Sequence, residues 1–205
     1  MGNKLIYSCL NEGVFSVELE RNVVISIIFP VEMGSTHTYP LLLMNDGQDF
    51  EQLGVLNTVS KLVEQGAMSP IVVVGIHANE NRIWEYGIGG QPDYANRGHK
   101  AAATTRFVLL ELLPYLTDTF RIDSRQIAYA GFSLGGLMAL DIAWSCSPIF
   151  TKVGVFSGAL WWRGKALDAG YQASDRLMHA KIRASVKVPD LLFWFQTGTR
   201  DEQDD

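Results

Sequence analysis

Cysteine is scarce in this chain, which has only Cys9 and Cys146 among its 205 residues. Two cysteines do not make a disulfide framework, so we expect two free thiols and a reducing compartment. The N-terminal residues 1–7 lack a long apolar signal region, and Ile6 occupies the place where a myristoylation motif needs Ser or Thr. The sequence therefore predicts a cytoplasmic protein.

Long hydrophobic runs and basic blocks are also missing. No apolar run reaches the roughly 20 residues that a membrane helix needs, so we expect no membrane partner. The net charge is −5 and basic residues are not clustered, which argues against a nucleic-acid partner. Neither a Cys/His cluster with zinc spacing nor a Gly-rich dinucleotide turn occurs, so we expect no metal and no cofactor.

The composition itself is ordinary for a globular protein, with 47% hydrophobic and 19% charged residues. The length suits one domain over residues 1–205 with a sizeable core. Apolar runs expected to be strands cover residues 4–10, 14–19, 23–29, 41–44, 71–75, 126–130, 152–157 and 191–197. Helical patterns cover residues 50–65, 101–120 with a kink or restart at Pro114, 134–144 and about 175–184.

This order of elements predicts an α/β protein. The first three strands, joined by tight turns, should form an antiparallel start to the sheet. The later strands alternate with helices and should form a mostly parallel sheet with helices on both faces. The long polar stretch of residues 77–99 is expected to be an ordered loop that lies over this sheet.

The most informative motif is Gly131-Phe-Ser-Leu-Gly135, a G-x-S-x-G between a strand pattern and a helix pattern. Such a strand, turn and helix form a nucleophile elbow, in which a strained turn presents the serine hydroxyl at the top of the sheet. Gly131 and Gly135 would allow the flanking backbones to approach closely. We therefore predict Ser133 as a nucleophile; the alternative is a glycine-rich turn that only packs.

Two backbone N–H groups are candidates for an oxyanion hole. One belongs to Leu134, at the start of the helix after Ser133, and the other to Gln48, in the loop Asn45–Asp49 after a buried strand. A plain Asx turn is the alternative for that loop.

An acid and a histidine should complete a catalytic triad. Asp201 follows the last strand and is the candidate acid, with Asp204 and Asp205 as competitors and a solvated acidic tail as the alternative. The order in this kind of fold is serine, acid, histidine. The histidines of the chain, His37, His77, His99 and His179, all precede Asp201, so the expected base is absent.

Three residues are candidates for substrate binding. Trp161 and Trp162 follow the strand at 152–157 and are either a lid on the core or a substrate wall. His77 follows the carboxyl end of a buried strand, where sites gather in open α/β sheets, although a structural role is the alternative.

These motifs together resemble the putative esterase family of α/β hydrolases, which includes enterochelin esterases, feruloyl esterases, S-formylglutathione hydrolases and mycolyltransferases. The likeness rests on residues 45–48, Arg82 with Glu85 and Tyr86, residues 111–114, 131–136, 152–158 with Trp161 and Trp162, and 198–202. It implies an α/β-hydrolase fold, Ser133 as nucleophile, Gln48 and Leu134 as the oxyanion hole, and Asp201 as a looser match for the acid. Family members continue with a helix, a final strand and the catalytic histidine, so we expect a fragment or a short relative that lacks this last strand and helix.

The function that follows is a serine carboxylic-ester hydrolase that acts on a small-molecule ester through an acyl-enzyme. Without the histidine, the 205-residue chain is expected to be weakly active or inactive. A non-catalytic binding relative and an acyltransferase are the alternatives. Because the sheet edge would be uncovered, we also expect self-association through that edge.

Overall fold

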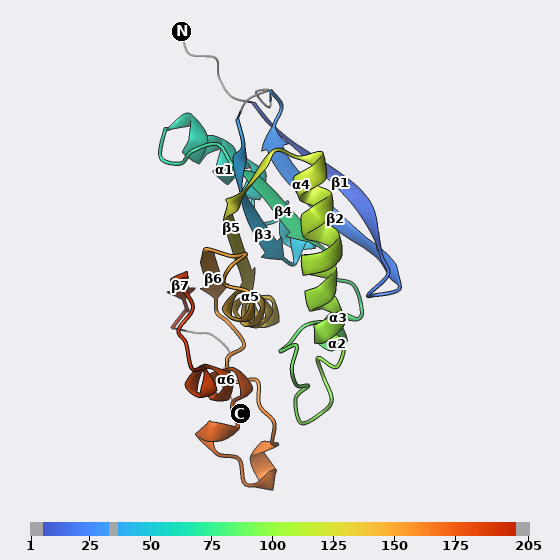
Figure 1. The fold of residues 1–205 in the computed structure, drawn as a ribbon, viewed down its shortest axis with the longest axis vertical. Helices are drawn as coiled ribbons and strands as arrows, with labels where there is room; N and C mark the ends of the chain where they lie inside the picture. The colour runs from blue at the N-terminus through green and yellow to red at the C-terminus, as the bar shows by residue number, and fades with distance from the viewer. Residues whose placement is uncertain (1–5, 33–36, 200–205) are drawn as a thin grey trace.

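The computed structural model describes residues 6–32 and 37–199, which form an α/β architecture around one seven-stranded sheet (Figure 1). The strand order is β1-β2-β4-β3-β5-β6-β7. β1 pairs with β2 and β2 with β4 in antiparallel fashion, and all other pairs are parallel. The strands are β1 Tyr7–Ser16, β2 Arg21–Pro30, β3 Tyr39–Asn45, β4 Val72–Ile76, β5 Ile122–Phe132, β6 Lys152–Phe156 and β7 Leu192–Gln196. This confirms the predicted mostly parallel sheet with an antiparallel N-terminal part.

The N-terminal strands differ from the prediction of three strands. β1 is one continuous strand, and the turn expected at residues 11–13 lies inside it, with Glu12 opposite Ile25 of β2. The chain reverses instead at residues 17–20, where Glu20 has a φ of 55°. Pairing along the whole length of β2 outweighs the local turn preference of Asn11 and Gly13.

The helices flank the sheet (Figure 1). They are α1 Val55–Glu64, α2 Arg82–Glu85, α3 Ala101–Arg106, η2 Phe107–Leu112, α4 Leu113–Thr119, α5 Ser133–Ser145 and α6 Leu177–Ala184, with short 3₁₀ turns at η1 Gly47–Asp49, η3 Leu167–Ala169 and η4 Ala173–Asp175. The helix expected at residues 50–65 begins later, at Val55, because residues 50–54 form turns that end in Gly54 at a φ of 61°.

The long helix at residues 101–119 changes its hydrogen-bonding pattern near Pro114. Its middle section, η2, is π-helical, and α4 begins at Leu113, next to the proline. Proline has no N–H and its ring clashes with the carbonyl of the residue four places earlier, here Leu110. The wider π turn before Pro114 accommodates this clash, so the predicted restart falls where the proline is.

Alternating side chains of the strands enter two cores. Leu41 and Leu43 of β3 belong to the larger core, with buried residues of α4 and α5, whereas Met44 belongs to the smaller core beneath α1. The sheet is therefore covered by helices on both faces.

Asp141 is the only charged residue of α5. It is buried, accepts a hydrogen bond from the Gly89 N–H and pairs with Lys181 of α6.

β7 does not have the burial that its apolar composition predicts. Leu192 and Trp194 are each 65% exposed and Phe195 is 54% exposed, so the prediction of a buried strand was wrong. The reason is position, because β7 is the last strand of the described sheet and pairs only with β6. An apolar run alone does not distinguish a central strand from an edge strand.

Candidate active site

Ser133 lies at the junction of β5 and α5, at the carboxyl end of a central parallel strand. Its φ is 50°, a left-handed conformation that is uncommon outside glycine, while Phe132 before it is extended. The side chain is exposed. The strand, strained turn and helix of a nucleophile elbow are thus all present at Ser133.

Three glycines allow the backbones at this elbow to touch. A Cβ on Gly131 would lie 2.4 Å from the carbonyl carbon of Gly135, and a Cβ on Gly136 would lie 2.7 Å from the Gly131 oxygen. A Cβ on Gly135 would lie 2.7 Å from Oδ2 of Asp46, in the loop after β3. Both the strand before Ser133 and the loop beside it therefore press directly on the first turn of α5.

The loop after β3 forms the 3₁₀ turn η1 and packs against β4. A Cβ on Gly47 would lie 2.4 Å from the carbonyl carbon of Gly75, and Asp46 has a φ of 64°. Gln48 is exposed, and its side chain accepts a hydrogen bond of 2.9 Å from the Ala78 N–H. Gln48 in η1 and Leu134 in α5 both lie in the first turn of a helix, where N–H groups have no partner within the helix.

Asn45 fastens this loop to the elbow. Its Nδ2 donates to the Gly135 carbonyl at 2.8 Å, and its Oδ1 accepts from the Tyr129 hydroxyl at 2.9 Å. Tyr129 and Asn45 are both buried, and burial raises the pKa of Tyr129, which keeps its hydroxyl a donor. Neither side chain could be assigned a role from the sequence; a polar residue directly before the Asp-Gly turn was the available signal.

His77 lines a cavity whose lining does not include Ser133. Its Nε2 is 2.7 Å from Oγ of Ser26, which donates to Asn11 Oδ1 at 2.6 Å. These residues and Gln48 line a cavity of about 350 Å³ between β1, β2, η1 and α1. Burial lowers the pKa of His77, although the nearby Asp49 opposes the change. β3 separates β4 from β5, which puts about 10 Å between their backbones.

The other three histidines lie on different elements from Ser133. His37 precedes the start of β3, whereas Ser133 follows the end of β5, at the opposite edge of the sheet. His99 is exposed, with Nδ1 3.0 Å from the Asn96 carbonyl oxygen, and His179 lies on α6. Within residues 6–32 and 37–199, no hydrogen bond joins Ser133 to a histidine.

The predicted acid, Asp201, lies outside the described residues, as do its competitors Asp204 and Asp205. The strand before it is informative. Gln196 at the end of β7 is level with Phe156 of β6, which is level with Phe132. The chain thus leaves β7 at the same edge and level as Ser133.

Trp161 and Trp162 follow β6 and differ in exposure. Trp162 is fully buried between Gly87 and Gly98, whereas Trp161 is partly exposed. The Arg97 guanidinium lies over both indole rings, 5.6 Å and 5.1 Å from their centres. Because the Ala159 N–H donates to the Ser133 carbonyl at 3.0 Å, this segment is tied to the elbow.

Within residues 6–32 and 37–199, no group of three or more His, Cys, Asp or Glu side chains is arranged to hold a metal ion. No helix in the same part of the chain is long and apolar enough to cross a membrane.

Comparisons with known proteins agree with this fold. A family model described as "Putative esterase" matches residues 16–205. The uncharacterized protein YjcH of Bacillus subtilis is 24% identical over 192 residues, which cover 91% of this chain and 71% of YjcH. Among solved structures, a ferulic acid esterase has a TM-score of 0.64 at 20% identity, covering 85% of this chain and 66% of its own.

A second solved structure is the enterobactin esterase FES of Shigella flexneri, crystallised in the presence of enterobactin. It has a TM-score of 0.74 at 21% identity, and the match covers 91% of this chain and 44% of FES. The chain therefore spans less than two thirds of the length of these two esterases. The likeness shows that the chain has the α/β-hydrolase fold.

Proposed function

Because the chain belongs to the putative esterase family, we propose that it is a serine carboxylic-ester hydrolase whose nucleophile is Ser133. The observation that carries this proposal is the exposed Ser133 at a φ of 50° on a strand-to-helix turn packed between glycines. Such a turn holds the hydroxyl at the end of a central strand, where a substrate carbonyl can reach it.

In the proposed reaction, Ser133 Oγ attacks the ester carbonyl carbon and loses its proton to a general base. The negative oxygen that forms is held by the backbone N–H groups of Gln48 and Leu134. The intermediate collapses, the base returns the proton to the leaving alcohol, and an acyl-enzyme remains on Ser133. Water then repeats the attack and releases the acid.

We propose that the base is a histidine supplied from outside residues 1–205, with Asp201 holding its tautomer. Two observations support this assignment. None of the chain's histidines is hydrogen-bonded to Ser133 in the described residues, and β7 delivers the following segment to the level of Phe132. The 205-residue chain alone should then have weak activity.

The substrate should be a small-molecule ester. Trp161, partly exposed and connected to the elbow through Ala159, is the best-placed wall for an apolar or aromatic part of it. Trp162 is fully buried and would support Trp161 rather than touch the substrate. His77 would contact the substrate near Gln48, because both residues line the same cavity.

A non-catalytic binding relative is the second candidate, favoured by the absence of a histidine on Ser133 within the described residues. Hydrolysis of short-chain p-nitrophenyl esters by the wild-type chain, Ser133→Ala and Ser157→Ala separates the two. Ser157 is a matched control, because it also follows a parallel strand and has a φ of 45°.

We expect turnover that Ser133→Ala removes and Ser157→Ala retains. Equal turnover in wild type and Ser133→Ala would rule out the serine mechanism. A wild-type chain with no turnover above the buffer rate would fit both the non-catalytic relative and a base supplied from outside residues 1–205. Acyl transfer to an added alcohol in the same assay would indicate an acyltransferase.

A further inference from the structure

Asp46 is a buried carboxylate in an unusual backbone conformation. It is only 5% exposed and has a φ of 64°, which is strained for a residue with a Cβ. A buried charge is tolerated when it is paired and hydrogen-bonded. Arg82 supplies this partner from the first residue of α2, with Nε 2.7 Å from Oδ1 and a terminal nitrogen 2.8 Å from Oδ2.

The forked contact is reinforced by Tyr86, one turn later. The Asp46 N–H donates to the Tyr86 hydroxyl at 3.4 Å, and the Arg82 guanidinium lies 5.0 Å from the Tyr86 ring centre. Its hydrogen bond with Asp46 raises the pKa of Arg82, and burial raises that of Tyr86, so the cation and the phenol both persist at neutral pH. Residues 82–86 therefore hold both the main chain and the side chain of Asp46 in place.

Asp46 contacts the Gln48 side chain and lies against Gly135, the residue after Leu134. Its Oδ1 accepts from Gln48 Nε2 at 3.3 Å, and its main-chain oxygen accepts from the Asp49 N–H at 3.1 Å. On the other side, Oδ2 occupies the space beside Gly135, 2.7 Å from where a Cβ would lie. The spacing between Gln48 and the first turn of α5 therefore depends on where Asp46 is held.

We propose that Arg82, acting through Asp46, is a positioning residue that sets the separation of the Gln48 and Leu134 N–H groups. This inference rests on the proposed function, because the oxyanion hole is part of it. It gives the segment after β4 a defined role, which is to hold the loop after β3 against the elbow. Arg82 touches no reacting atom in this scheme.

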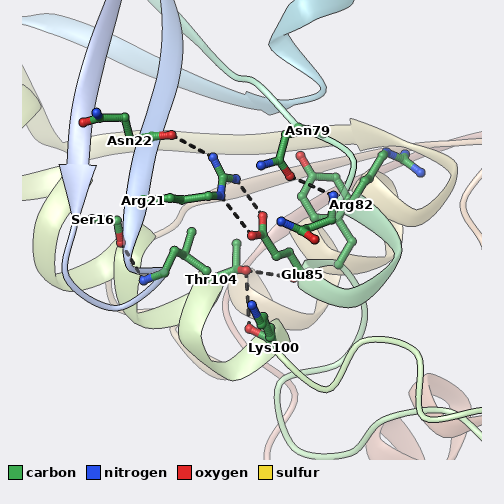
Figure 2. Close-up of polar contacts among 12 residues, drawn as sticks. Ser16, Arg21, Asn22, Asn79, Arg82, Glu85, Lys100 and Thr104 are labelled. Atoms are coloured by element: carbon green, nitrogen blue, oxygen red, sulfur yellow. Dashed lines mark hydrogen bonds and ion pairs between the residues drawn. The ribbon is translucent and has the colours of Figure 1, made fainter.

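The chain contains a matched control for this pair. Arg21 forms an equally forked pair with Glu85, at 2.9 Å and 2.6 Å, and Glu85 is on α2 with Arg82 (Figure 2). Glu85 is 1% exposed, so this pair is as buried as the Asp46 pair. The hydrogen bonds of Glu85 connect α2 to β2 and α3, and they do not involve the loop Asn45–Asp49.

The test compares Arg82→Gln with Arg21→Gln by hydrogen exchange of the peptide that contains residues 46–50. We expect the loop amides to exchange at least about tenfold faster in Arg82→Gln, because local opening becomes easier when the loop loses its anchor. Arg21→Gln should leave this peptide close to wild type. Asp46→Asn, which keeps the shape and removes the charge, is the second variant if Arg82→Gln folds poorly.

Kinetics supply the second readout. Arg82→Gln should lower kcat by roughly 10-fold to 100-fold with KM nearly unchanged, somewhat less than deletion of an oxyanion donor. Arg82→Lys should fall between, because an ammonium cannot form the fork. Exchange of residues 46–50 that is the same in Arg82→Gln and Arg21→Gln would overturn the proposal.

Hydrogen exchange can be measured without turnover. The positioning role of Arg82 and the serine mechanism can therefore be refuted independently. Suppose that loop exchange is faster in Arg82→Gln but Ser133→Ala has no effect on hydrolysis. The positioning role of Arg82 would then stand, and the serine mechanism would be refuted. The positioning role alone would be refuted if Ser133→Ala abolished hydrolysis while Arg82→Gln changed neither the exchange of the loop nor kcat.

Discussion

Gly131→Ala is the sharpest test of the elbow that the structure offers. The new Cβ would lie 2.4 Å from the carbonyl carbon of Gly135 and 2.5 Å from its oxygen. Ordinary contacts of this kind are about 3.4 Å or longer, so β5 and α5 would have to separate by about 1 Å. The obstacle is backbone on both sides, and no side chain can rotate away to relieve it.

The cost should be at the upper end of the range for an overpacked core, about 3 kcal/mol. α5 is buried along most of its length, with Gly135 through Ala143 all inaccessible or nearly so, and it packs on β5, β6 and β3. A shift of its first turn therefore disturbs the larger core. With a urea m-value of about 3 kcal/mol/M for a domain of this size, the unfolding midpoint should fall by about 1 M.

Urea unfolding followed by tryptophan fluorescence measures this shift. Gly90→Ala is the control, because Gly90 has no atom within 4 Å of the added Cβ and no positive φ. Its midpoint should stay within about 0.2 M of wild type or rise slightly. A Gly131→Ala midpoint equally close to wild type would show that strand and helix are not in contact at the elbow, and would remove the steric argument for the motif.

Two further predictions concern the stability and the association of the chain. Burial lowers the folded-state pKa of His77 below its usual 6.5, so below that pH the unfolded chain binds more protons and stability falls as the pH falls. The urea midpoint of wild type should therefore drop more between about pH 7 and 5 than that of His77→Gln, and equal drops would contradict the burial argument. We also propose that two copies of the chain associate through β7, because its exposed Leu192 and Trp194 carry no charge that would prevent pairing. Sedimentation should show a concentration-dependent dimer that Trp194→Lys weakens, and a monomer at all concentrations would refute it.

The sequence predicted the parts of the fold that depend on local patterns. The G-x-S-x-G between a strand pattern and a helix pattern located the elbow, because the close approach of Gly131 and Gly135 leaves room for no other residue. Prediction from the sequence failed where the pairing of strands decides whether a segment is a strand, a turn or buried. Asn11 and Gly13 favour a turn, yet ladder hydrogen bonds to β2 hold them in a strand. β7 looks buried by composition and is exposed by its place in the sheet.

The same limit applies to the site. Ser133, Gln48 and Leu134 could be named because each follows a strand at a fixed offset. Asn45, Asp46 and Arg82 could not be assigned roles, since their contacts join segments 36 and 90 residues apart in the chain. Such contacts depend on the order of strands in the sheet, which spacing along the sequence does not reveal.

The order of strands also explains how the proposed catalytic groups are divided along the chain. β3, β5 and β6 are parallel neighbours, so the loop at Asn45 and the elbow at Ser133 open at one edge of the sheet. β7 runs parallel to β6 and ends level with Phe132, which brings the segment toward Asp201 to that edge as well. The proposed nucleophile and oxyanion hole thus lie on residues before β7, which Asn45, Asp46 and three glycines hold together. An acid and a base would then join the edge of the sheet where Asn45 and Ser133 are already held in place. For this reason we expect Arg82→Gln to loosen the loop whether or not a histidine is present.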